Sequence, residues 1–202
     1  MVAEIQYWKS VAAGLIAPKV PVLPYVPEER QLPSRVLALP TAWKGIESIL
    51  GDLIRHFGIG SHACLEFGVE YGYSTAALSC FFDTVTGVDT FCGDKNTDNK
   101  QDIFTDTLAR LARFENIHLV RSDYHDWIAQ DHRFYDLIHV DIVHTYMDTF
   151  TCGLWSANHA QCVLFHDTQS FHAVKQAVTD IARQTGRRFY NFNESFGLGI
   201  LV

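Results

Sequence analysis

The chain has 202 residues and a formal net charge of −7, with 48% hydrophobic and 19% charged residues. This length suits one domain with a full core, and the composition is that of a globular chain rather than a disordered one. The acidic balance argues against a nucleic-acid substrate, and no apolar run approaches the roughly 18 residues that a membrane-spanning helix needs.

Residues 1–40 differ in kind from the rest of the chain. All six prolines lie between Pro18 and Pro40, which excludes a regular helix or a central strand there. We expect an extended, proline-rich arm that lies on the domain, on a neighbouring subunit or over the mouth of the active site. Residues 41–202 are expected to form the domain itself.

From Thr41 onward, helical and strand patterns alternate. Apolar residues from Ile46 to Phe57 recur at helical spacing, and Gly58 is expected to end this helix. A strand follows from Ala63 and reaches Glu66. Further strands are predicted at 84–88, 117–120, 135–140, 162–165, 188–192 and 197–202, and further helices near 103–114, around Trp127, at 145–156 and at 171–185.

Alternation of this kind predicts a parallel sheet with right-handed crossovers. The last two strands are joined too tightly for a helical crossover, so the final strand is expected to be antiparallel. The predicted fold is therefore α/β: a Rossmann-like, doubly wound, mostly parallel seven-stranded sheet. Acids end or follow five of its strands and should meet at one edge of the sheet, namely Glu66, Asp89, Asp123, Asp141 and Asp167.

A glycine-bracketed turn follows the first strand of the domain. It reads E-x-G-x-x-x-G-x-S, with Glu66, Gly68, Gly72 and Ser74, and so lacks the G-x-G-x-x-G of a dinucleotide site. Glycines let the backbone turn sharply and let a ligand approach, and the helix that begins near Gly72 offers free N–H groups. Asp89, at the end of the next strand, can accept hydrogen bonds from the hydroxyls of a ribose.

This pattern resembles the first two motifs of class I S-adenosylmethionine-dependent methyltransferases, over about residues 41–202. The resemblance implies that Glu66, Gly68, Gly72 and Ser74 belong to the site for S-adenosylmethionine, that the glycines and Ser74 line its methionine part, and that Asp89 holds its ribose. It also places Asp123 against the adenine, where Tyr124 can pack on the ring. The alternative from the residues alone is an acid at a strand end that caps the next helix.

A second motif, Asp141-Ile142-Val143-His144-Thr145-Tyr146, precedes a strand that ends in His166-Asp167. Together they resemble the metal-dependent small-molecule O-methyltransferases, and within them the macrolide-sugar O-methyltransferases and cephalosporin-hydroxylase-like proteins. The resemblance implies Mg²⁺ held by Asp141, His166 and Asp167, with Asp141 and His144 as catalytic residues and His144 as the base. Ile142-Val143 stands where those families tend to have Gly-Asp.

We therefore expect a cytoplasmic enzyme that methylates a hydroxyl of a sugar or secondary metabolite, with a homodimer as the default assembly. The five cysteines lack a C-x-x-C spacing and no signal peptide is evident, which favours a reducing compartment. One alternative keeps the scaffold and makes it an iron-dependent hydroxylase. Another is a module that binds S-adenosylmethionine without turnover. A nicotinamide dehydrogenase lacks its glycine fingerprint.

Overall fold

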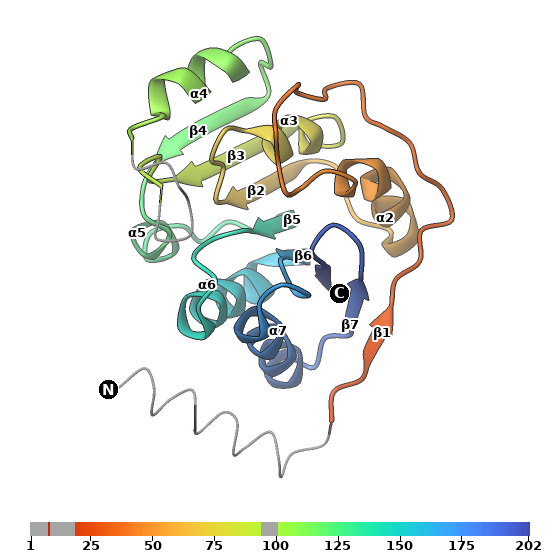
Figure 1. The fold of residues 1–202 in the computed structure, drawn as a ribbon. Coiled ribbons are helices and arrows are strands. Elements are labelled where there is room, and N and C mark those ends of the chain that lie inside the picture. The colour runs from red at the N-terminus through yellow and green to blue at the C-terminus, as the bar shows by residue number, and fades with distance from the viewer. Residues whose placement is uncertain (1–7, 9–18, 94–100) are drawn as a thin grey trace.

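The fold is built on one eight-stranded sheet whose strands run in the order β1-β7-β8-β6-β5-β2-β3-β4. The computed structural model describes Trp8 and residues 19–93 and 101–202 (Figure 1). The strands are β1 (Val22–Pro24), β2 (Ala63–Phe67), β3 (Thr84–Asp89), β4 (Ile117–Arg121), β5 (Tyr135–Val140), β6 (Ala160–His166), β7 (Phe189–Phe192) and β8 (Leu198–Leu201). The predicted doubly wound α/β fold is confirmed.

The helices that connect these strands follow the predicted alternation. They are the 3-10 helix η1 (Ile46–Ile49) and the α-helices α2 (Leu50–Phe57), α3 (Tyr73–Leu78), α4 (Phe104–Leu111), α5 (Tyr124–Ile128), α6 (Tyr146–His159) and α7 (His172–Thr185). Gly58 and Gly186 end α2 and α7 in the left-handed conformation, at φ 62° and 71°, which a residue without a Cβ adopts freely. No helix in the described part of the chain combines the length and the apolar character that crossing a membrane requires.

Strand β8 is antiparallel to both of its neighbours, and every other pairing is parallel. It lies between β6 and β7, with Leu164 opposite Ile200 and Phe192 opposite Leu198. The tight turn that joins β7 to β8 leaves no room for a helical crossover, as the sequence predicts. The carboxyl ends of β2, β3, β4, β5 and β6 therefore share one edge.

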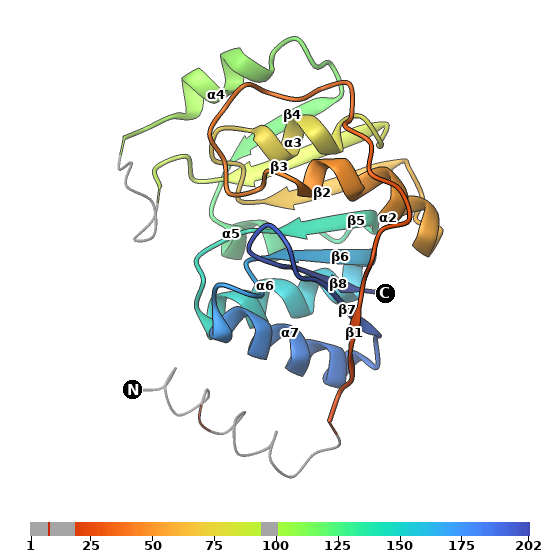
Figure 2. The same ribbon diagram turned by 45° about the vertical axis from the view of Figure 1, so that its right-hand side comes forward.

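Two apolar cores cover the two faces of the sheet. Side chains of successive residues in a strand point to opposite faces, so Cys64 packs into the core shared with η1, α2, α3 and α4, whereas Leu65 packs into the core under α5, α6 and α7. Both views show α6 and α7 side by side on their face (Figure 2). The sheet is thus a rigid support for whatever its carboxyl edge carries.

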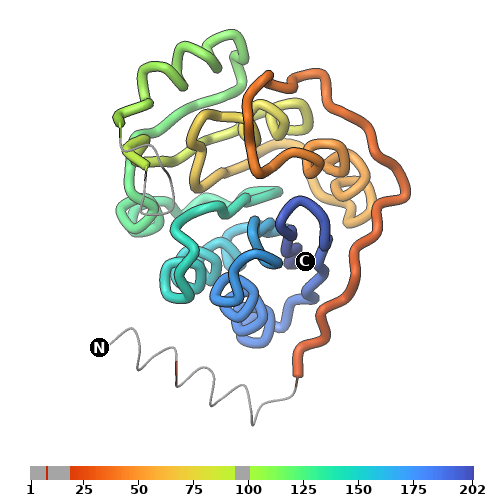
Figure 3. Tube along the Cα trace, in the orientation of Figure 1, coloured from red at the N-terminus to blue at the C-terminus, as the bar shows by residue number. Residues whose placement is uncertain are grey.

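The proline-rich arm supplies the eighth strand. Val22, Leu23 and Pro24 pair in parallel with Phe189, Tyr190 and Asn191 at the sheet edge, a place where a proline without an N–H is tolerated. The arm then runs in an extended conformation along one side of the molecule and returns to the sheet before η1 (Figure 3). The other residues of the predicted arm, 1–18 apart from Trp8, lie outside the described part of the chain.

The arm is fastened to the domain by buried and charged contacts. The hydroxyl of Tyr25 donates to Asp52 of α2 at 2.6 Å, and the backbone N–H groups of Glu28 and Glu29 donate to the same carboxylate. Arg30 makes two contacts with Glu194 in the β7–β8 turn. The described part of the arm lies on its own domain, and its last residue, Pro40, also lines the cavity described below.

Candidate active site

A cavity of about 390 Å³ opens at the carboxyl edge of the sheet. Most of the residues predicted for the site line it: Gly68, Ser74, Asp89, Asp123, Tyr124, Asp141, His144, His166 and Asp167. Residues spread over about a hundred positions of sequence thus meet at one place, as the rule for ligand sites in open parallel sheets predicts. Glu66 and Gly72 do not line it.

Gly68 brings the glycine turn directly against the end of β5. Its φ is 87°, and a Cβ built on it would lie 1.7 Å from the carbonyl oxygen of Asp141. Its own N–H donates to the carbonyl of Val88 at 3.0 Å. The positive φ agrees with the sharp turn that the sequence predicts, and the neighbouring backbone of Asp141 adds a second reason for the absence of a side chain.

Gly72 holds the turn into α3 rather than the cavity wall. It has a φ of 82°, and a Cβ there would lie 2.6 Å from the Leu111 side chain of α4. Ser74, two residues later, is 7% exposed and does line the cavity. Within this motif, Gly72 thus allows close packing against α4, and Ser74 lines the cavity.

Glu66 lies behind the cavity, fully buried, and anchors a chain of polar groups. Its carboxylate accepts a hydrogen bond from the hydroxyl of Thr75 in α3 and lies 2.9 Å from Nδ1 of His139. The indole N–H of Trp43 donates a hydrogen bond to Nε2 of His139 at 3.2 Å. Nε2 is therefore an acceptor, and Nδ1 of the neutral ring carries the N–H that donates a hydrogen bond to Glu66. Glu66 thus supports the cavity wall and its predicted cofactor contact stays a prediction, and His139 is the hydrogen-bonded core residue that its apolar strand indicates.

Asp89 ties the glycine turn to the end of β3. Its Oδ2 accepts from the N–H groups of Val69 and Glu70, both at 2.8 Å, and its Oδ1 accepts from the N–H of Phe91 at 2.7 Å. A carboxylate has about four lone-pair positions, so Oδ1 keeps acceptor capacity toward the cavity.

Asp123 and Tyr124 begin α5 at the cavity wall. Oδ1 of Asp123 accepts from the backbone N–H of His125 at 2.8 Å, which makes Asp123 the cap of α5 as well as a lining residue. The Tyr124 hydroxyl donates to Asp148 at 2.8 Å, and its ring stacks on His125 at 3.9 Å. Burial first, and then the bond to Asp148, raise the pKa of Tyr124.

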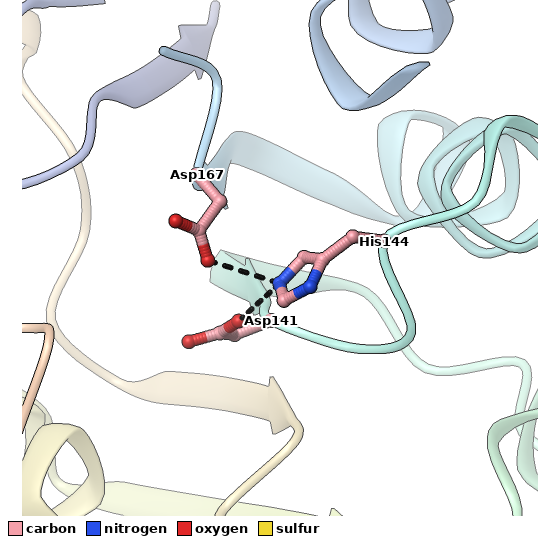
Figure 4. Close-up of side chains that lie close together, drawn as sticks. All are labelled: Asp141, His144 and Asp167. Atoms are coloured by element: carbon pink, nitrogen blue, oxygen red, sulfur yellow. Dashed lines mark ion pairs between the residues drawn. The ribbon is translucent and has the colours of Figure 1, made fainter. Parts of the chain in front are cut away.

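Asp141, His144, His166 and Asp167 form a compact cluster, which we call the His/Asp cluster. Nε2 of His144 lies 2.9 Å from Oδ2 of Asp167 and 3.5 Å from Oδ1 of Asp141. Nδ1 of His166 lies 3.0 Å from the same Asp167 oxygen and 3.3 Å from Oδ2 of Asp141. Figure 4 shows both carboxylates directed at one ring nitrogen of His144. The ring of His144 stacks on Phe171 at 4.2 Å, which fixes its plane.

Mutual attraction sets the charges of the His/Asp cluster. Burial alone would lower the pKa of both histidines, but the two carboxylates outweigh it and raise the pKa of His144 to about 9 and that of His166 to about 10. Burial would raise the pKa of Asp167, yet His144 and His166 hold it at about 2, and they lower the pKa of Asp141 further. Without a bound cation, the cluster is two ion pairs at neutral pH.

These close contacts are not hydrogen bonds. Neither ring nitrogen of His144, and neither ring nitrogen of His166, has a hydrogen-bond partner among the described residues. Buried polar groups without a partner are rare and call for an explanation. One carboxylate oxygen each from Asp141 and Asp167, with one nitrogen of His144, lie within 4.8 Å of one another, which is close enough to share a metal ion.

Several lining residues were not predicted from the sequence. Trp43 and Tyr73 reach the cavity from the segment before η1 and from α3, and His125 and Asp148 reach it from α5 and α6. His125 follows Tyr124 directly, so its position could have been inferred. Nothing in the pattern around Trp43 distinguishes it from a core residue, since its role depends on His139 almost a hundred positions away.

Comparison with protein families shows to which family the chain belongs. The family described as a methyltransferase domain matches residues 65–168, just over half of the chain. The chain belongs to this methyltransferase family. The match begins in β2 and ends just after Asp167, so it contains both the glycine turn and the His/Asp cluster.

Solved structures show the same fold. A candidate O-methyltransferase from Klebsiella pneumoniae has a TM-score of 0.56 at 15% identity, covering 84% of this chain and 82% of its own. An O-methyltransferase from Bacillus cereus in complex with S-adenosylhomocysteine has 0.54 at 14% identity, with 85% and 84% covered. Fibrillarin from Aeropyrum pernix with bound S-adenosylmethionine has 0.51 at 11% identity, with 71% and 67% covered. A search of curated proteins gave no match.

Family and fold together make this protein an S-adenosylmethionine-dependent methyltransferase of the class I fold. At such low identity the structural likeness speaks for the fold alone. The acceptor, the atom that is methylated and the metal have to be argued from the methyltransferase's own cavity.

Proposed function

We propose that this methyltransferase transfers the methyl group of S-adenosylmethionine to a hydroxyl group of a small molecule. The observation that carries the proposal is the position of the His/Asp cluster, in the same cavity as the glycine turn and Asp89. The turn and Asp89 would hold the cofactor, with Asp123 toward its adenine. The cluster would then face the methyl group and the acceptor.

A hydroxyl needs help to react, because its oxygen is a weak nucleophile until it loses its proton. In the transfer, an oxygen–carbon bond forms to the methyl group while the carbon–sulfur bond breaks. The electron pair of the broken carbon–sulfur bond stays on sulfur and neutralises the sulfonium, and the hydroxyl proton passes to the solvent. Asp141, His144 and Asp167 present both acceptor oxygens and a ring nitrogen at one point, which supports binding and orientation of the acceptor there.

The donors of the cluster fit a divalent cation. Two carboxylates and two imidazoles with unpartnered nitrogens would be held together by its charge, and when bound it would lower the pKa of a hydroxyl in contact with it. The Mg²⁺ implied by the resemblance fits less well, because Mg²⁺ prefers an all-oxygen octahedron and keeps several waters. The predicted base, Nε2 of His144, lies at the same centre as the carboxylate oxygens, and a lone pair that binds a cation cannot also take a proton.

The test is methyl transfer from radiolabelled S-adenosylmethionine to a panel of small hydroxyl compounds, each assayed with added Mg²⁺, Mn²⁺ or Co²⁺ and with EDTA. We expect product with an O-methyl group, and a rate at least about 100-fold lower for Asp167→Asn. Asp126→Asn, an exposed acid of α5 outside the cavity, is the matched control. Transfer to nitrogen or carbon alone would refute the proposal, and binding of S-adenosylhomocysteine without any transfer would favour a non-catalytic module.

One second candidate is favoured by a specific observation, the two imidazoles beside the two carboxylates. Such donors resemble those of non-haem iron sites, so the predicted alternative of a hydroxylase is tested in parallel. Oxygen consumption that depends on Fe²⁺ and on the acceptor would support it, and full methyl transfer without iron would exclude it.

A further inference from the structure

The spacing of donor atoms in the His/Asp cluster matches the edges of a coordination sphere. Metal–nitrogen and metal–oxygen bonds in such sites are about 2.0–2.2 Å long, so neighbouring donors around one ion lie roughly 3.0–3.4 Å apart. The four nitrogen–oxygen separations here are 2.9, 3.0, 3.3 and 3.5 Å. Asp167 Oδ2 lies near both ring nitrogens, and Asp141 turns one oxygen toward each.

Burial shields the donors of His166 from water. His166 is 3% exposed, its Nδ1 meets the two carboxylates in ion pairs, and both of its ring nitrogens lack a hydrogen-bond partner among the described residues. Buried polar groups of this kind are rare and point to a ligand. The stacked ring of Phe171 holds the plane of His144, so this donor is preorganised.

The identity of the donors then selects the ion. Carboxylate oxygens accept any divalent cation, but imidazole nitrogens favour the later first-row metals over Mg²⁺ and Ca²⁺. We infer that the His/Asp cluster binds a first-row transition-metal ion of the Mn²⁺ to Zn²⁺ series through Asp141, His144 and Asp167, with His166 paired to both carboxylates beside it, and that it discriminates against Mg²⁺. This inference rests on the proposed function, since the same cluster would serve the transfer.

His144 accordingly changes role. As a ligand through Nε2 it orients the ion, and it is not the group that takes the proton of the acceptor. In the sequence both histidines lie between the two aspartates, His144 three residues after Asp141 and His166 directly before Asp167. Loss of either nitrogen should therefore weaken binding of the ion without removing the carboxylates.

The experiment uses the untagged, EDTA-treated full chain and two probes. Isothermal titration compares Co²⁺ with Mg²⁺, and we expect Co²⁺ to bind at least 100-fold more tightly. His144→Gln and His166→Gln should each lower the affinity for Co²⁺ by at least about 10-fold. His118→Gln, an exposed histidine of β4, should leave it unchanged. Binding of S-adenosylhomocysteine by each variant verifies that it is folded.

A second measurement needs no variant. Electron spin echo envelope modulation of the Mn²⁺-loaded wild-type chain should show coupling to ¹⁴N of imidazole. Equal affinity for Mg²⁺ and Co²⁺, absence of the ¹⁴N signal, or full Co²⁺ affinity in both histidine variants would each overturn the inference. Tight Co²⁺ binding with a ¹⁴N signal but no methyl transfer would refute the proposed function and leave the metal site standing.

Discussion

Asp89 holds the glycine turn with the same two oxygens that the proposed function assigns to the cofactor. Three backbone N–H groups already donate to it, so its negative charge stabilises the glycine turn before any ligand arrives. A charged acceptor is worth about 1.5–3 kcal/mol per hydrogen bond. Replacement by the neutral amide therefore acts on the turn and on the ribose together.

We predict that Asp89→Asn raises the dissociation constant of S-adenosylhomocysteine by about 10- to 100-fold. Isothermal titration measures this, with Asp126→Asn as the control of equal charge change. An unchanged constant in the Asp89 variant would mean that the ribose is held elsewhere in the cavity.

The His/Asp cluster gives the metal-free protein a dependence of stability on pH. The pKa values of His144 and His166 are raised to about 9 and about 10 by their carboxylate partners, against burial. Because the folded pKa lies above the ordinary value near 6.5, the stabilisation is complete below about pH 6.5 and is lost as pH rises through 9 to 10.

In EDTA, we therefore predict that the unfolding midpoint falls between pH 7 and pH 10 by at least about 2–4 °C, the equivalent of about 1 kcal/mol. Differential scanning calorimetry measures it, and His166→Gln should flatten the fall. A bound metal ion should also flatten it, because its histidine ligands are already deprotonated. A midpoint independent of pH in the EDTA-treated wild type would contradict the assigned ion pairs.

At the scale of elements, the contact between the glycine turn and β5 is the tightest joint around the cavity. Gly68→Ala would have to place a Cβ 1.7 Å from a backbone oxygen, at a φ of 87°. Gly186, at the end of α7, also has a positive φ of 71° but nothing within 4 Å of its missing Cβ. A comparison of Gly68→Ala with Gly186→Ala therefore separates the effect of backbone strain from that of steric overlap.

We predict that Gly186→Ala lowers the free energy of unfolding by about 1–2 kcal/mol, and that Gly68→Ala lowers it by about 2–5 kcal/mol because overlap adds to strain. Only Gly68→Ala should also weaken binding of S-adenosylhomocysteine. Urea unfolding followed by circular dichroism compares the two. Equal losses would show that the turn can move away from β5.

Most elements could be predicted from the sequence because their signals are local. Gly58 and Gly186 end helices where their lack of a Cβ indicates, and β3, β5 and β6 ran to their acids as β-branched and apolar runs indicate. Helix α6 continued three residues past its predicted end, to His159. The reason is a side-chain contact: His159 stacks on Trp155 at 4.2 Å and bonds its carbonyl, so the helix passes straight into β6.

The site could be predicted only as far as strand ends reveal it. The acids at the carboxyl edge met in one cavity, but pairs such as Trp43 with His139, or Glu66 with Thr75, depend on the three-dimensional fold. Motif resemblance placed Glu66 and Gly72 with the cofactor, and packing places both behind the wall. The unpartnered nitrogens of His166 have no counterpart in the sequence pattern, since burial alone reveals them.

At the scale of the whole molecule, the arm contributes stability through contacts far from the cavity. Tyr25 donates to a buried Asp52, whose pKa burial would raise but which Tyr25 and two backbone N–H groups lower. We predict that Tyr25→Phe lowers the free energy of unfolding by about 1–3 kcal/mol and leaves methyl-transfer kinetics unchanged. Tyr190→Phe, which removes an exposed hydroxyl contact to Arg188, is the control, and a larger effect there would refute the assignment.

The pairing of β1 with β7 has a consequence for how the protein is made. Val22 is paired with Phe189, so strand β1 has to wait until a partner far along the chain has been synthesised. The arm stays undocked while β2 to β6 assemble, and contacts of such long sequence separation form slowly. Docking of the arm at the sheet edge is therefore expected to be a late and slow step of folding, and until then the nascent arm is open to chaperones and proteases.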